Sequence, residues 1–140
     1  MKTIARCLTT VSILFVGCSK QSEPNVTNAA RPMKMILELH SLPDHDPKVV
    51  SVSPDERNIE ATIRNQSWDE ITFVVLKIDE KNWFEISGSP KPEEGLSASC
   101  CEGGQQQVSD GSPGSLDACV SLMLSFFRGD NRWRKEISWH

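Results

Sequence analysis

The amino-acid sequence predicts an all-β domain, an antiparallel β-sandwich of about seven short strands. Two observations point to this fold class. Apolar and polar residues alternate with a period of two in several segments after residue 32, as they do in strands with one buried face. Turn residues such as Gly, Pro, Asp and Asn separate these segments. Residues 33–140 are therefore predicted to form one β-sandwich domain.

Each predicted strand is a run of alternating or continuous apolar residues that ends at turn residues. In chain order, the runs are 33–39, 48–53, 59–63, 71–78, 83–87, 116–126 and 133–139. The run at 71–78 is apolar on both faces, which is typical of a central strand covered on two sides. The run at 83–87 is expected to be a short edge strand, and a long loop is expected to follow it.

The segment after residue 115 also fits a helix. Its helical stripe would consist of Leu116, Val120, Met123, Leu124 and Phe127. We favour a strand because alternation continues for six steps. A Gly-Asp-Asn turn then leads to a Trp-rich segment that could complete a hairpin.

The first 18 residues have the three parts of an export signal in order. Lys2 and Arg6 form a basic start, and residues 7–16 form an apolar stretch. This stretch is much shorter than the roughly 20 residues that span a bilayer. Small Gly17 stands directly before Cys18, where a peptidase needs little bulk.

The sequence Leu14-Phe15-Val16-Gly17-Cys18 resembles the lipobox of bacterial lipoproteins. The resemblance implies that residues 1–17 are removed and that Cys18 carries the lipid. The protein would then be anchored to a membrane of the bacterial cell envelope, at the periplasmic face of the outer membrane or at the cell surface. The polar residues 18–32 would form a flexible tether. The alternative is an ordinary secretory signal that leaves Cys18 as a thiol.

Charge and motifs exclude several functions. Removing Lys2 and Arg6 with the signal reduces the 15 basic residues to 13, against 19 acidic ones, a net charge of −6. Nucleic-acid binding is not expected, because phosphate contacts need clustered Lys and Arg. The sequence has no nucleophile elbow, phosphate-binding loop or zinc-protease motif. We therefore predict no catalytic residues and no cofactor, and we expect the protein not to be an enzyme.

Three cysteines follow the signal and tether, and export makes a disulfide their expected state. The pairing would join Cys119 to Cys100 or Cys101, since adjacent cysteines rarely bond each other. The chain-entropy model gives such a closure roughly 3 kcal/mol. One alternative is a soft-metal or redox site, although no Cys-x-x-Cys spacing supports it. The other is that the cysteines remain free thiols.

Two further motifs have ordinary explanations. His40, Asp44 and His45 are weak candidates for metal ligands, together with Asp46, but prolines bracket this loop as in a solvated turn. We predict no metal site there. Residues 128–130, Arg-Gly-Asp, match a tripeptide read by some cell-surface receptors. So short a match occurs often by chance, and a hairpin turn explains all three residues.

Residues 59–73 (IEATIRNQSWDEITF) resemble the strand–turn–strand passage of immunoglobulin-like domains in bacterial envelope proteins. Residues 110–115 are similar to the entry into a late strand of such domains. The resemblance implies an immunoglobulin-like topology and brings no functional residues. We expect a non-catalytic envelope lipoprotein, a binding or structural module that presents its sandwich to a protein or glycan. The alternative is a periplasmic copper- or zinc-handling or thiol-redox module that uses Cys100, Cys101 and Cys119.

Overall fold

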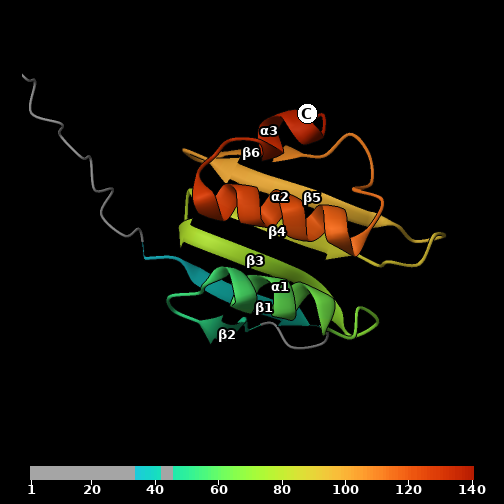
Figure 1. Ribbon diagram of the computed structural model, residues 1–140, viewed down its shortest axis with the longest axis horizontal. Helices are drawn as coiled ribbons and strands as arrows, with labels where there is room; N and C mark the ends of the chain where they lie inside the picture. Colours follow the sequence, from blue (N-terminus) through green and yellow to red (C-terminus); the bar gives the residue numbers. More distant parts are fainter. Residues whose placement is uncertain (1–33, 42–45) are drawn as a thin grey trace, which may run out of the picture. The chain divides into compact units, whose positions relative to one another are not determined.

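The computed structural model describes residues 34–41 and 46–140 (Figure 1). The predicted signal peptide, the lipid site Cys18 and the tether lie outside the described residues. The fold is built on one six-stranded antiparallel sheet with the strand order β2-β1-β3-β4-β5-β6. Its strands are β1 (Ile36–Ser41), β2 (Lys48–Ser51), β3 (Ile71–Asp79), β4 (Asn82–Gly88), β5 (Leu96–Glu102) and β6 (Gln105–Val108).

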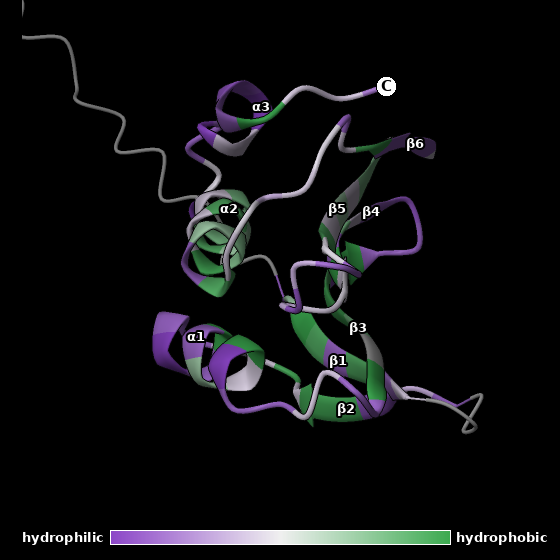
Figure 2. Ribbon diagram, turned by 90° about the vertical axis from the view of Figure 1, so that its right-hand side faces the viewer, coloured by the Kyte–Doolittle hydropathy of each residue, from purple (hydrophilic) through white to green (hydrophobic). Residues whose placement is uncertain are grey.

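Helices α1 (Glu56–Arg64) and α2 (Leu116–Arg128) cover one face of this sheet, and the short α3 (Trp133–Glu136) follows them. Figure 2 shows α1 and α2 on the same side of the strands, with no described helix on the other side. The core lies between these two layers. It contains Leu37, Val74, Leu76, Phe84 and Ile86 from the sheet, with Ile59, Ile63, Cys119 and Met123 from the helices.

The predicted antiparallel β framework is confirmed, but the predicted second sheet is not formed by the described residues. Four predicted strands correspond to β1, β2, β3 and β4. Strand β4 lies inside the sheet, between β3 and β5, and is not an edge strand. The expected long loop contains β5 and β6, which meet at Gly103 and Gly104. Both glycines have positive φ angles, of 58° and 88°, as tight hairpin turns require.

The predicted strand at residues 59–63 is wrong, because this segment is helix α1. Asp55 begins the helix with a reciprocal cap: its carboxylate accepts from the Asn58 amide at 2.7 Å, and the Asn58 side chain accepts from the Asp55 amide at 3.1 Å. Ile59 and Ile63 are fully buried on the sheet side. Residues four apart fit both a period of two and a helical period, so the short alternation was ambiguous.

The predicted strand at residues 116–126 is also wrong, and the helical alternative holds. The Ser115 hydroxyl caps α2 by accepting from the Ala118 amide at 3.1 Å. Gly129 ends the helix with a left-handed φ of 67°, and its amide donates to the carbonyls of Phe126 and Ser125. The glycine that suggested a hairpin turn is therefore a helix C-cap.

The two helices run antiparallel, and an ion pair links them near each end. The Arg64 guanidinium lies 2.6 Å from the Asp117 carboxylate. At the opposite end, Arg128 donates twice to the Glu56 carboxylate, at 2.8 and 2.6 Å. Because all four side chains are exposed, these pairs fix orientation more than they add stability.

The predicted last strand at residues 133–139 is wrong as well. Trp133 begins α3, and only the last three residues pair with the sheet region. Trp139 forms a bridge to Ser109, and His140 exchanges two main-chain hydrogen bonds with Val108 of β6, at 3.0 and 3.1 Å. Trp133 is nevertheless a core residue with 1% of its surface exposed. Its ring lies against Phe84, Phe126 and Trp139, with centroid distances of 5.5, 5.9 and 5.3 Å. The Trp133 ring thus helps to close the core, although it comes from a helix and not from a strand.

Candidate binding groove on the open sheet face

Alternate residues of β1, β3, β4 and β5 point away from the helices, and we call the surface that they form the open face. Strand pairing arranges them in rows across the sheet. The rows are Ile36–Lys77–Trp83–Cys101, Glu38–Val75–Glu85–Ser99 and His40–Phe73–Ser87–Ser97. The open face therefore carries both large apolar and acidic side chains. No described helix covers it (Figure 2).

A shallow groove of about 180 Å³ lies on the open face, and we refer to it below as the groove. Its walls come from three neighbouring strands and the β3–β4 turn. The lining residues are Glu38, His40, Phe73, Val75, Lys77, Glu80, Trp83 and Glu85. Ligand pockets for small molecules usually measure about 300–1,000 Å³. The groove therefore has room for about one side chain of a larger partner.

One end of the groove is an ordered aromatic wall. The imidazole of His40 stacks on the Phe73 ring, with 4.4 Å between centroids and 28° between planes. The His40 Nε2 atom lies 3.5 Å from a Glu38 carboxylate oxygen. This nitrogen is buried and has no hydrogen-bond partner among the described residues. Such an orphaned polar atom is costly unless a ligand or solvent satisfies it.

The charges in the groove are unbalanced. Three carboxylates, from Glu38, Glu80 and Glu85, face the single ammonium group of Lys77. That ammonium lies 2.7 Å from the Glu80 carboxylate. The hydrogen bond to Glu80 raises the pKa of Lys77 against the opposing effect of burial. Lys77 is therefore already paired with an acid.

Glu85 is the carboxylate without a counter-charge. Its strand partners on either side are Val75 and Ser99. Burial raises the pKa of the Glu85 carboxyl. No ion pair or hydrogen bond reaches this side chain from the part of the chain that the structure describes. Trp83 stands two residues earlier on the same strand and face. The groove therefore contains a carboxylate without a counter-charge, Glu85, next to the Trp83 side chain.

A larger cleft of about 310 Å³ lies near the C-terminal end of α1. Its two cations are already paired, which makes it a weaker candidate. Arg64 bonds to Glu60 and Asp117, and Lys91 lies 2.5 Å from Asp69.

The three predicted disulfide cysteines are free thiols, which corrects the expected cross-link. Adjacent positions on β5 place Cys100 beside Phe84 in the core and Cys101 beside Trp83 on the open face. Cys119 is fully buried on α2. The two candidate partners thus lie on opposite faces of the sheet, as consecutive residues of a strand do.

The buried thiols have little redox or metal-binding character. Burial raises the pKa of Cys100 to about 11 and that of Cys119 to about 12. Both are therefore protonated at neutral pH, whereas the thiolate is the reactive and metal-binding form. Within residues 34–41 and 46–140, no group of three His, Cys, Asp or Glu side chains is placed to hold a metal ion.

The structure describes only some of the weak metal-ligand candidates in and beside the β1–β2 loop. Asp44 and His45 lie outside the described residues, and Asp46 is exposed. His40 is described, and its ring belongs to the groove, where it stacks on Phe73.

The Arg-Gly-Asp tripeptide has a structural role. Arg128 pairs with Glu56 and Gly129 caps α2. Asp130 accepts hydrogen bonds from the hydroxyl of Ser125 and from Arg132. These contacts occupy the groups that a receptor would need to contact.

Sequence reasoning missed Trp83 and Glu85 as site residues. The alternation of β4 was a usable signal, because it places both side chains on one face. Nothing in the sequence indicated that this face would remain uncovered by a second layer.

The described helices include none that is long and apolar enough to cross a membrane. Comparison with known proteins finds no family model that matches this chain, and no curated protein or solved structure that is similar to it.

Proposed function

We propose that this protein is a non-catalytic binding module that presents the open face of its sheet to a protein or glycan. The observation that carries the proposal is the groove, where partly exposed aromatic side chains lie beside a carboxylate without a counter-charge. The lipobox-like sequence ending at Cys18 supports a lipid anchor and a place in the bacterial cell envelope. In that setting the open face would contact another envelope component.

The composition of the open face favours binding over a purely solvent-exposed role. A sheet with one solvated face normally carries polar residues there. Here four outward positions hold apolar residues, namely Ile36, Phe73, Val75 and Trp83. Aromatic residues are enriched at protein interfaces, and apolar surface with a polar rim marks such sites. The metal-handling or thiol-redox alternative lacks comparable support, because Cys100 and Cys119 are buried and protonated.

Site-specific photo-crosslinking in cells tests this proposal. A photoreactive amino acid is placed at Ser87 or Ser97 on the open face, and at Arg57 or Ser121 on the exposed sides of the helices. We expect discrete adducts from the two open-face positions and none from the helical ones. Adducts only from the helical positions, or the same adducts from both sets, would contradict the proposal.

A further inference from the structure

The groove lacks one positive charge at a defined place. The Lys77 ammonium is held by Glu80, and the Glu38 carboxylate lies beside His40. Glu85 remains, half-buried between Val75 and Ser99, with Trp83 on the same face of its strand. A carboxylate withdrawn from water is costly unless a cation or several donors accompany it. The missing partner is therefore a cationic group.

We propose that the partner of the open face is a protein that inserts a lysine or arginine side chain between Trp83 and Glu85. This inference rests on the proposed binding function of the open face. The guanidinium or ammonium would pair with the Glu85 carboxylate and lie against the Trp83 indole. Charge-assisted hydrogen bonds and cation–π contacts are both favourable there, because the site is partly removed from water.

The size of the groove supports a side chain over a larger ligand. A volume of about 180 Å³ is below the usual range for cofactor and small-molecule pockets. A single long side chain from a docked protein fits this space. The rest of that protein would lie on the apolar outward residues Ile36, Phe73 and Val75.

The buried Nε2 atom of His40 indicates that the ligand also carries polar groups. This nitrogen has no partner among the described residues, and an apolar lid would leave it unsatisfied. A docked polypeptide brings main-chain amides and carbonyls along with its side chain. A protein partner can therefore supply both a cationic side chain for Glu85 and a hydrogen-bonding group for the Nε2 atom of His40.

The affinity of the groove for a cationic ligand is expected to depend on pH through the protonation of Glu85. Burial raises the pKa of the Glu85 carboxyl, and a cationic ligand favours its ionised form. Binding is therefore expected to weaken as the pH falls and Glu85 becomes protonated. The other titratable groups that line the groove with Glu85 are Glu38, Glu80 and His40. Lys77 stays charged throughout and does not alter this sign.

The test uses the full chain and short capped Gly/Ser peptides with one central arginine, lysine or citrulline, followed by NMR titration. Citrulline keeps the shape of arginine without its charge. We expect the arginine and lysine peptides to shift the indole signal of Trp83 and the amide signals of β4, and the citrulline peptide not to do so. The Glu85→Gln variant is expected to bind about tenfold more weakly.

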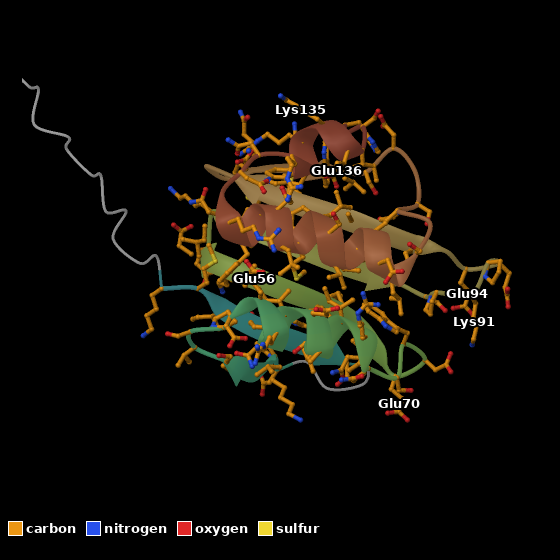
Figure 3. The ribbon with its side chains drawn as sticks, viewed as in Figure 1. Glu56, Glu70, Lys91, Glu94, Lys135 and Glu136 are labelled. Atoms are coloured by element: carbon orange, nitrogen blue, oxygen red, sulfur yellow. The ribbon has the colours of Figure 1, made fainter. Side chains whose placement is uncertain are left out.

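The matched control is Glu70→Gln, which removes the same charge elsewhere. Figure 3 shows Glu70 pointing away from the ribbon at an exposed turn. It should leave peptide binding unchanged, and far-UV circular dichroism checks that both variants fold.

Three results would overturn the inference: equal binding of the citrulline peptide, unchanged affinity in Glu85→Gln, or groove signals that respond only to neutral oligosaccharides. None of them affects the photo-crosslinking pattern. Open-face adducts obtained together with any of these results would therefore leave the binding function in place and remove only the cationic ligand.

Discussion

Replacing Trp133 with alanine tests the packing of the C-terminal segment directly. The indole is 1% exposed and lies against three other aromatic rings, those of Phe84, Phe126 and Trp139. Its main-chain amide bonds to the Ser125 hydroxyl at 2.9 Å and would be retained. The substitution therefore removes ring contacts and leaves a cavity, which typically lowers the free energy of unfolding by about 3–5 kcal/mol. A domain of this size has roughly 5–15 kcal/mol in total.

For a domain of roughly 100 residues, 1 kcal/mol corresponds to about 4 °C in melting temperature. We therefore expect Trp133→Ala to melt about 12–20 °C below the wild type, measured by circular dichroism with urea unfolding as a second assay. Trp139→Ala is the matched control. Trp139 is only half-buried and donates one hydrogen bond, at 3.3 Å, to the Trp133 carbonyl. Trp139→Ala should therefore lower the melting temperature by roughly half as much as Trp133→Ala does.

The relative melting temperatures of Trp133→Ala and Trp139→Ala distinguish a C-terminal strand from the helix α3. A strand would place Trp133 and Trp139 on the same buried face, and the two substitutions would then be about equally damaging. The helix predicts that Trp133 matters more. Equal melting temperatures for the two variants, or a Trp133→Ala variant within a few degrees of the wild type, would refute the packing described above.

Two further predictions concern turns and pH. A Cβ at Gly88 would lie 2.3 Å from the Gly95 carbonyl oxygen, whereas one at Gly129 meets nothing within 4 Å. Gly129→Ala should therefore cost only about 1 kcal/mol of backbone strain, and Gly88→Ala should cost more in urea unfolding; the reverse order would contradict this. The hydrogen bond from Ser125 lowers the pKa of Asp130 from 3.8 to about 2. Its stabilising effect is complete above pH 3.8 and is lost as the pH falls through 2. Asp130→Asn should flatten that part of the stability profile, and an unchanged profile would refute the role of Asp130.

The sequence was sufficient to predict β1 to β4, because their alternation or continuous apolar character extends over whole strands. It failed at α1, where Ile59 and Ile63 satisfy two periods at once. Asp55 followed three residues later by Asn58 is a helix-start signal, and the prediction of a strand at 59–63 did not use it. At α2, Arg128 and Gly129 are typical of a helix C-terminus as well as of a turn. The prediction of a strand at 116–126 depended on a second strand at 133–139 to complete a hairpin, and the structure has no such strand.

The groove could be predicted only in part. The apolar character of β3 on both faces suggested a strand covered on two sides. The structure covers Val74 and Leu76 with helices, while Phe73 and Val75 face outward without a described layer above them. His40 and Trp83 meet in one groove because β3 pairs with both of their strands. Such pairing is set by tertiary packing and cannot be read from the local pattern of residues.

The two neighbouring cysteines of β5 offer the chain's own chemical reporters. Cys100 points into the core and Cys101, 6% exposed, lies beside Trp83 on the open face, although they are consecutive residues. Alkylation of Cys101 should slow when a ligand occupies the groove. Alkylation of Cys100 should follow the separation of the helices from the sheet. Comparing the two rates in single-thiol chains would therefore distinguish ligand binding at the open face from opening of the core.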